Sequence, residues 1–270
     1  MITVDTVWSD VQQVRDRGPL VHNITNYVVM NSTANALLAI GAAPVMAHAV
    51  QEVADMAGLA SALVINIGTL SEPWIEAMGL AMRRAAERGI PIVLDPVGAG
   101  ATPYRTRTAA ELISETAPTI IRGNASEVMA LAGSVGDGAG GTQGVDSADP
   151  AEAALEAART LHERYGAVVA VTGETDYVVD DDVLRITGGH PLMARVTGTG
   201  CTASALCAAF AAVNRSPFAA TAHALAALGA AGAAAGARAR GPGTMQLHLY
   251  DELHTLTREQ IVRHVGVAGA

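Results

Sequence analysis

The sequence predicts an α/β fold in which a mostly parallel central sheet carries helices on both faces. Three observations support this. Short apolar, β-branched runs alternate with longer amphipathic or alanine-rich segments from residue 62 to residue 173. The run at 167–173 is continuously apolar, as in a strand buried on both faces. Half of the residues are hydrophobic, which is ample for a core in a chain of 270 residues.

The individual elements follow from these runs and from the residues that begin and end helices. We expect strands at 62–68, 91–95, 119–123 and 167–173. We expect helices at 71–89, near 105–116, from 124 and at 150–166. Ser71 is a candidate N-cap, Pro73 lies in the first turn and Gly89 follows the end of that helix. Asn124 and Glu127 have the spacing of a capping box.

The pattern changes after residue 173. Residues 176–187 resemble a hairpin with a polar tip, and everything from 200 onward indicates helices. The glycine-rich stretch 132–147 favours a surface loop, with a flexible flap as the alternative. Neither a repeat nor a linker is visible, so we expect one domain over 1–270.

Composition limits the possible partners. The net charge of −9 argues against a nucleic-acid binder and favours small molecules. Residues 219–237 are nearly all alanine and glycine, which predicts an interior helix rather than a membrane span. We see no signal peptide, and Cys201 and Cys207 are six residues apart on one expected helix, where they cannot bridge. A cytoplasmic protein is expected.

All 17 basic residues are arginine, and lysine is absent. This excludes Schiff-base chemistry, pyridoxal phosphate attachment and the phosphate-binding lysine of a Walker P-loop. Phosphate chemistry in this chain therefore has to use arginine, backbone amides, helix ends and metal.

Four expected strands end in polar or glycine-containing turns, at 66–69, 95–100, 122–127 and 172–174. In a parallel sheet these turns gather at one edge, where ligands bind. Asp95 and Glu127 offer oxygen ligands for Mg²⁺ with a nucleotide, although structural caps explain them equally well. Arg122 suits a phosphate.

The stretch RVTGTGCTASALCAAF at 195–210 predicts a tight turn that enters a helix. Gly198 and Gly200 permit the turn, and the free amides at the helix start form an anion site. Cys201 lies there, and we expect its pKa to be lowered. The alternative is a helix start with small residues chosen for packing.

The N-terminal stretch 19–53 contains several asparagines among apolar residues. Such amides are costly to bury unless they are bonded or face a ligand. The residues concerned are Asn23, Asn26, Asn31 and Asn35. Met46 ends a short apolar run and is either a soft pocket wall or an ordinary core residue.

Seven motifs occur in order over essentially the whole chain: HNITNYVVMNSTANALLAIGAAPVMAHAVQEVADMA, VINIGTL, LDPVGAGATPYR, IRGNASEV, VTGETD, VTGTGC and GPGT. As an ordered set they closely resemble the hydroxyethylthiazole kinases of the ribokinase-like superfamily. The resemblance departs from the common pattern at Ala43, where serine is frequent, and at Gln51, where glutamate is frequent.

The resemblance implies a ribokinase-like kinase that uses ATP and Mg²⁺ to phosphorylate the primary alcohol of 4-methyl-5-(2-hydroxyethyl)thiazole in thiamine salvage. It also implies a homotrimer with active sites between subunits. Asn26, Met46 and Gly198 match thiazole-site positions. Residues matching nucleotide-phosphate contacts are Arg122 and Thr172, and those matching the acids near metal and phosphates are Asp95 and Glu127.

The superfamily resemblance implies that many related sugar kinases carry an aspartate base at the position that Cys201 occupies in this chain. Phosphoryl transfer depends mainly on positioning and charge stabilisation. We therefore assign the larger role to the backbone amides of residues 198–201. Cys201 is then a modest proton acceptor or an orienting group. The alternatives are hydroxymethylpyrimidine kinase, a cysteine-nucleophile hydrolase or acyltransferase with His190 or another of the eight histidines as base, and a non-catalytic thiazole-binding or regulatory protein.

Overall fold

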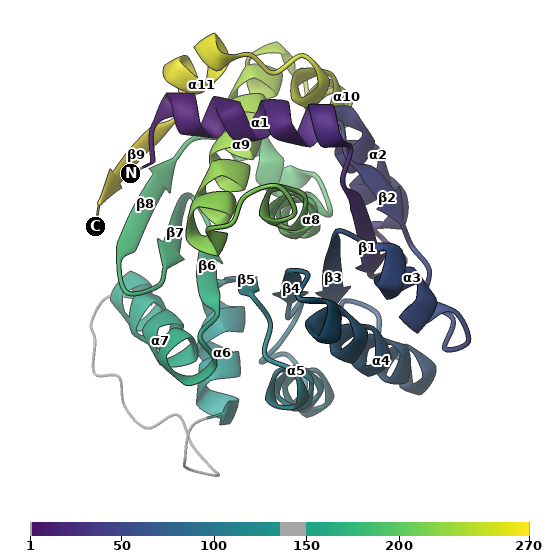
Figure 1. The fold of residues 1–270 in the computed structure, drawn as a ribbon. Helices are drawn as coiled ribbons and strands as arrows, with labels where there is room; N and C mark the ends of the chain where they lie inside the picture. Colours follow the sequence, from purple (N-terminus) through teal and green to yellow (C-terminus); the bar gives the residue numbers. More distant parts are fainter. Residues whose placement is uncertain (1, 136–149, 270) are drawn as a thin grey trace.

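The computed structural model describes residues 2–135 and 150–269. Within them a nine-stranded sheet has the order β2-β1-β3-β4-β5-β6-β7-β8-β9 (Figure 1). Strands β2 to β6 in that order pair in parallel, and β6 to β9 pair antiparallel. The strand bounds are β1 Leu20–Ile24, β2 Ala43–Val45, β3 Ala62–Asn66, β4 Ile92–Asp95, β5 Ile120–Asn124, β6 Val168–Thr172, β7 Thr175–Val179, β8 Val183–Thr187 and β9 Gly266–Gly269.

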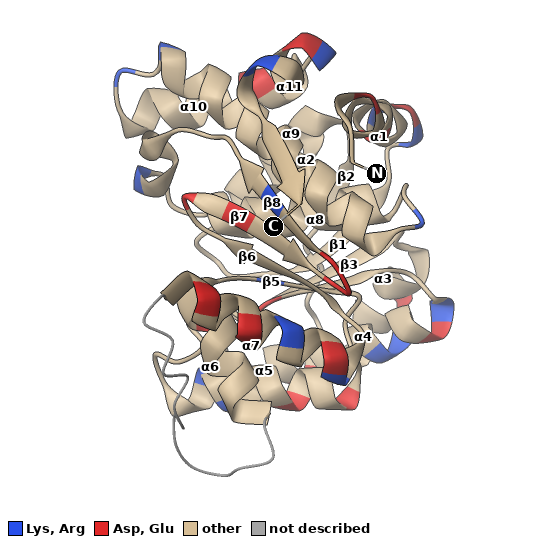
Figure 2. Ribbon diagram, turned by 90° about the vertical axis from the view of Figure 1, so that its left-hand side faces the viewer, with Lys and Arg blue, Asp and Glu red and all other residues tan. Residues whose placement is uncertain are grey.

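Helices cover both faces of this sheet, so the predicted fold class is confirmed (Figures 1 and 2). Each face has its own apolar cluster, as expected when both faces of a parallel sheet are buried. One cluster includes residues of α1 Val4–Arg17, α2 Met30–Ile40, α8 Thr199–Ala211, α9 Pro217–Arg238, α10 Pro242–His254 and α11 Arg258–His264. The other includes residues of α3 Val53–Leu59, α4 Glu72–Arg88, α5 Pro103–Glu115, α6 Ala125–Val135 and α7 Pro150–Tyr165.

The helix signals in the sequence correspond to real boundaries. Helix α4 starts directly after Ser71 and ends at Gly89, which has the left-handed conformation, although the Ser71 side chain makes no capping bond. Helix α6 begins with a true capping box. The Glu127 amide donates to Asn124 Oδ1, and the Asn124 amide donates to Glu127 Oε2, each at 2.9 Å.

Two regions differ from the sequence prediction. The predicted hairpin is present as β7 and β8, but the chain after residue 200 also contains the strand β9. Its sequence is Gly-Val-Ala-Gly and all four residues are exposed, so it has little strand signal of its own. Residues 132–135 of the predicted glycine-rich loop belong to α6, and the remainder lies outside the described residues.

Helix α9 is the one helix among residues 2–135 and 150–269 that is long and apolar enough to cross a membrane. Within its most apolar window 78% of the residues are buried inside the protein, as predicted for an interior helix. Charged residues lie mainly on outer helices, and acidic and basic side chains are mixed on α7 and α11 (Figure 2).

Candidate active site

Polar side chains line the carboxyl edge of five adjacent parallel strands. Asn26 follows β1, Asn66 and Asp95 end β3 and β4, Arg122 lies in β5, and Thr172 ends β6. These five residues, which we call the strand-end network, are linked by hydrogen bonds and close charges described below. Parallel packing of neighbouring strands therefore gathers residues that are up to 146 positions apart (26 to 172).

Asp95 is the central acid of this network and is fully buried. Its Oδ2 accepts hydrogen bonds from Asn66 Nδ2 at 2.9 Å and from Ser204 Oγ at 2.8 Å. Its Oδ1 has no hydrogen-bond partner and lies 3.8 Å from Arg122 Nη1. Burial raises the pKa of Asp95 to about 6, although the charge of Arg122 and both hydrogen bonds oppose this shift.

Arg122 connects the acid to a cavity. Its Nη2 donates to Thr172 Oγ1, and its Nε has no hydrogen-bond partner. The sequence shows no acid beside Arg122, but the fold brings Asp95 to it. One guanidinium therefore faces a buried carboxylate and also lines an open cavity.

That cavity has a volume of about 870 Å³, the size of a pocket for a cofactor or a nucleotide-sized molecule. Its polar lining includes Arg122, Thr172 and Thr199. The apolar part of the lining comprises Ile186, Met193, Ala194, Ala203, Leu225 and Leu228. An anion and an apolar ring can therefore be held in the same cavity.

Helix α8 begins at this cavity. Gly198 is its N-cap with φ +82°, and a Cβ atom there would lie 2.7 Å from Val29 Cγ1. A Cβ at Gly200 would lie 2.7 Å from Arg122 Nη1. The first bond of the helix runs from the Thr202 amide to the Gly198 carbonyl at 2.8 Å. The amides of residues 199–201 precede that bond and are free to bind an anion.

The prediction that the Cys201 pKa is lowered is wrong. Burial and the nearby Asp95 charge raise the pKa of Cys201 to about 11, outweighing the opposing effects of Asn66, Arg122 and Asn26. The position at a helix start does not compensate for removing the thiolate from water. Asn26 Nδ2 lies 3.6 Å from Cys201 Sγ, and both cysteines are free.

Glu127 has both carboxylate oxygens bonded to backbone amides. Oε2 caps Asn124, and Oε1 accepts from the Gly98 amide at 2.9 Å. The carboxylate thus ties the turn after β4 to the turn after β5. These contacts are those of a structural cap, one of the two alternatives that the sequence left open for Glu127. The negative charge of Glu127 nevertheless acts on Asp95 and helps to raise the Asp95 pKa.

Arg105, the last residue of the motif LDPVGAGATPYR, holds two turns of the site together, a role that the motif alone does not indicate. Its Nη1 donates to the carbonyls of Ile67 at 3.1 Å and Val97 at 2.8 Å. Its Nη2 donates to the Gly68 carbonyl at 2.9 Å. One guanidinium therefore fastens the turn after β3 to the turn after β4.

Replacing Arg105 by alanine is expected to lower the free energy of unfolding by about 2 kcal/mol, because charged donors to three carbonyls are lost. Urea unfolding followed by circular dichroism measures this. The matched control is Arg107→Ala on the same helix. Arg107 Nε lies 4.0 Å from Glu111 Oε1, and this exposed ion pair contributes little to stability. An equal effect of the two substitutions would contradict the fastening role.

Met46 and three of the N-terminal asparagines, Asn23, Asn31 and Asn35, lie outside the strand-end network. Met46 follows the edge strand β2, is half-buried, and its carbonyl lies 3.1 Å from His48 Nδ1. It does not line the cavity beside Arg122. Asn31 and Asn35 are exposed and bond to each other on α2, whereas Asn23 is buried.

An aromatic cluster near this end of the sheet was also missed in the sequence analysis. The Trp74 ring centroid lies 4.9 Å from that of Tyr27 and 4.5 Å from that of His48. The three residues come from the turn after β1, the turn after β2 and the start of α4. Their wide sequence separation gave no pattern to detect.

A metal would have limited protein ligands at this site. Among residues 2–135 and 150–269, no group of three His, Cys, Asp or Glu side chains gathers as a metal site. Asp95 Oδ1 is the one carboxylate oxygen of Asp95 and Glu127 without a hydrogen bond. This fits Mg²⁺, which keeps several waters and commonly uses one or two carboxylates together with substrate phosphates.

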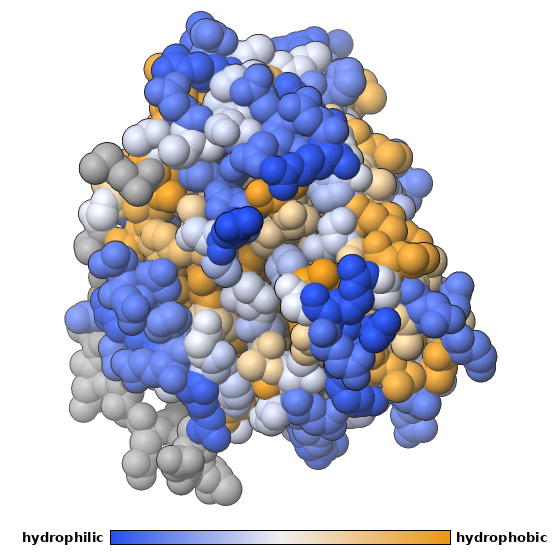
Figure 3. All heavy atoms as spheres, in the orientation of Figure 1, coloured by the Kyte–Doolittle hydropathy of each residue, from blue (hydrophilic) through white to orange (hydrophobic). Residues whose placement is uncertain are grey.

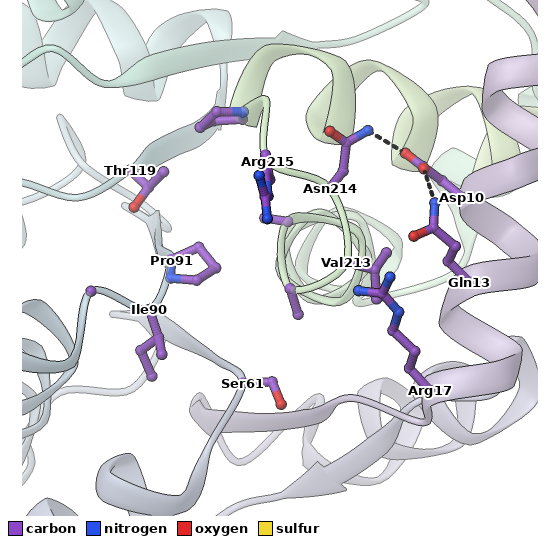
Figure 4. A pocket seen from close by; sticks show the side chains of 14 residues that line it. Asp10, Gln13, Arg17, Ser61, Ile90, Pro91, Thr119, Val213, Asn214 and Arg215 are labelled. Carbon is purple, nitrogen blue, oxygen red and sulfur yellow. Dashed lines mark hydrogen bonds between the residues drawn. The ribbon is translucent and has the colours of Figure 1, made fainter.

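A second cavity of about 740 Å³ lies at the opposite, amino edge of the sheet (Figure 4). It is lined by Ser61, Pro91 and Thr119, which precede β3, β4 and β5. Asp10 in its wall accepts hydrogen bonds from Gln13 and Asn214. None of the site residues predicted from the sequence lines this cavity.

The fold defines the class of protein first. Pyridoxal kinase from Staphylococcus aureus superposes with a TM-score of 0.64 at 15% identity, covering 93% of this chain and 99% of that chain. A ribokinase-like superfamily protein from Enterococcus faecalis gives 0.63 at 14% identity. At such low identities the comparison shows a shared fold, the ribokinase-like α/β fold.

Closer relatives identify the family. The model of the hydroxyethylthiazole kinase family matches residues 11–259. Hydroxyethylthiazole kinase from Syntrophus aciditrophicus is 57% identical over 98% of both chains, and that from Nitratidesulfovibrio vulgaris is 54% identical over 100% of both. The structure of hydroxyethylthiazole kinase from Pyrococcus horikoshii superposes with a TM-score of 0.90 at 43% identity, covering 98% of this chain and 99% of that chain. This chain belongs to the hydroxyethylthiazole kinase family.

Proposed function

We propose that this protein transfers the terminal phosphoryl group of ATP to the hydroxyl of 4-methyl-5-(2-hydroxyethyl)thiazole, in thiamine biosynthesis or salvage. Family membership supports the reaction. The observation that carries the proposal in the structure is the convergence of Arg122 and the start of α8 on one cavity edge, with the buried Asp95 carboxylate beside Arg122.

Arg122 and Thr172 are the proposed nucleotide-phosphate contacts. Both line the cavity, and Arg122 is held against Thr172 with its charge close to the strand ends. A guanidinium binds phosphate oxygens in a planar, bidentate manner that suits this position. The apolar lining of the same cavity supports binding of the adenine ring.

The amides at the start of α8 are proposed to stabilise the transferring phosphoryl group. Gly198 and Gly200 permit the close approach of backbone that this requires, because any side chain would meet Val29 or Arg122. Cys201 is proposed mainly to orient the alcohol. Because its thiol remains protonated near neutral pH, its contribution as a proton acceptor is small. The same raised pKa weighs against a cysteine-nucleophile hydrolase, and His190 Nδ1 lies 3.2 Å from the Leu192 amide, which it caps.

Mg²⁺ is the proposed metal, and Asp95 is the residue that would hold it through Oδ1, directly or through water. When bound, the ion neutralises charge on the phosphate oxygens. Glu127 contributes negative charge to the metal region and keeps the turn after β4 in place.

Asn26, Met46 and Gly198 are the proposed thiazole-side residues. Asn26 is buried and bonded to Asn66, while Met46 supplies an apolar, polarisable surface at the neighbouring strand end. Tyr27, Val28, Leu38 and Leu59 are each more than half exposed, and apolar surface is visible over α2, β2 and α3 (Figure 3). This surface supports a homotrimer with active sites between subunits.

One domain over 1–270 is supported by the single sheet that runs through the described residues. A cytoplasmic location is supported by two free cysteines.

The direct test is a coupled ADP-release assay that compares hydroxyethylthiazole with hydroxymethylpyrimidine and ribose. We expect a clear preference for the thiazole alcohol in kcat/KM. Preference for either alternative would replace the proposed substrate. Thiazole binding without ADP release would indicate a binding protein.

Cys201→Ala is expected to keep measurable kinase activity, within about tenfold of the original kcat, because the amides rather than the thiol stabilise the transferring group. Cys201→Asp is expected to remain active as well. Steady-state kinetics check both, with size-exclusion chromatography and thermal unfolding as controls for assembly and folding. Complete loss in both folded variants would overturn the modest role assigned to Cys201.

A further inference from the structure

Asn66 and Ser204 are two residues of the site with no assigned contact to either substrate or to the metal. Both are buried polar side chains that contact the same atom, Asp95 Oδ2. Buried polar groups are costly unless their hydrogen bonds are satisfied, so their placement needs an explanation beyond packing.

The amide of Asn66 is fixed in one orientation by its partners. Its Oδ1 accepts from Asn26 Nδ2 at 2.9 Å and from the Gly68 amide at 3.0 Å, and its Nδ2 donates to Asp95. A flipped amide would place a donor against two donors and an acceptor against the carboxylate. Asn66 thus joins the thiazole-side residue Asn26 to the acid that faces the nucleotide side.

Ser204 approaches the same carboxylate from the other direction. It lies on α8, one turn after Cys201, and its side chain is completely buried. Helix residues 203 and 205–210 around it are buried and apolar, so the Asp95 oxygen is its specific partner. This bond ties the first turns of α8, which contain the anion-binding amides, to the end of β4.

Together the two bonds determine which oxygen of Asp95 is free. Both donors occupy Oδ2, and Oδ1 is left without a hydrogen bond beside Arg122. If either donor were missing, the carboxylate could rotate about its χ2 angle, which has a broad energy profile.

We propose that Asn66 and Ser204 are positioning residues of the phosphoryl transfer: they hold the Asp95 carboxylate with Oδ1 toward Arg122, and they fix the start of α8 and Asn26 relative to it. The inference rests on the proposed function. It predicts that the loss of either donor slows the transfer step while both substrates still bind.

The experiment measures kcat and both KM values for Ser204→Ala, Asn66→Ala and the double variant. Each single variant is expected to lose about tenfold in kcat, with either KM changed less than about threefold, because one hydrogen bond to a charged group is removed. The double variant is expected to lose distinctly less than the product of the two single losses, because both residues act on one carboxylate.

Two comparisons separate positioning from packing. Thr221→Val removes another completely buried helical hydroxyl, which donates to the Pro217 carbonyl at 2.7 Å in α9, and is expected to leave kcat unchanged. Ser204→Thr restores a hydroxyl and is expected to recover most of kcat. Thermal unfolding and the stoichiometry of binding a non-hydrolysable ATP analogue report the folded fraction of every variant.

The inference is overturned if folded Ser204→Ala and Asn66→Ala retain kcat within about twofold, or if the single losses multiply in the double variant. It is also overturned if kcat falls only in proportion to the nucleotide-binding fraction. If the original protein releases no ADP with the thiazole alcohol, the proposed function fails instead. The original protein, assayed in parallel, therefore distinguishes the two failures.

Discussion

Arg122→Ala is expected to raise the KM for ATP by about 10- to 150-fold, while the KM for hydroxyethylthiazole changes only slightly. The physical reason is the loss of a charged, forked donor to phosphate, a contact worth about 1.5–3 kcal/mol. Arg122 contacts Thr172 and lies beside Asp95 on the nucleotide side of the network, and it lines the cavity. Steady-state kinetics with each substrate varied in turn measure the effect.

Two further arginine variants sharpen this test. Arg122→Lys keeps the charge without the planar fork, and we expect an intermediate KM for ATP. Arg83→Ala removes an exposed arginine paired with Glu115 at 3.4 Å on the surface, and no kinetic change is expected. Equal increases in the KM values for ATP and thiazole in Arg122→Ala would count against the phosphate role.

Gly200→Ala is expected to reduce kcat/KM for ATP by about 100-fold without lowering thermal stability. The new Cβ would lie 2.7 Å from Arg122 Nη1 and 2.9 Å from Nη2, so the guanidinium has to leave its place between Thr172 and Asp95. Alanine is also the better helix former by about 1 kcal/mol, which favours the folded state. Kinetics and thermal unfolding of the same sample measure the two effects.

Gly133→Ala is the matched control for this substitution. Gly133 lies in α6, and a Cβ there would meet nothing within 4 Å. The Gly133→Ala variant should gain the same helix propensity as Gly200→Ala and keep full activity. Near-normal activity of Gly200→Ala would show that Arg122 relocates freely, and the assigned geometry at the start of α8 would then be wrong.

The carboxyl edge of the sheet could be predicted because its signals are local. Apolar runs define β3 to β6, and the polar residues that follow them, such as Asp95 and Thr172, must then lie at one edge. The capping box of Asn124 and Glu127 was equally visible, because it needs residues only three positions apart.

Contacts between distant segments could not be predicted. The fastening of two turns by Arg105, the paired donors Asn66 and Ser204, and the cluster around Trp74 join residues far apart in the chain. The Cys201 pKa was mispredicted for the same reason. A helix start is visible in the sequence, but the depth of burial and the proximity of Asp95 are not.

The sequence by itself determined the alternating α/β fold class, the glycine turn at the start of α8 and the reliance of this lysine-free chain on arginine and backbone amides. Motif order also determined the family. Only the tertiary structure decided which oxygen of Asp95 is free, because that depends on two donors from β3 and α8 converging on the other one. Periodicity and capping act within a few residues, whereas a buried carboxylate is oriented by whatever the fold packs around it.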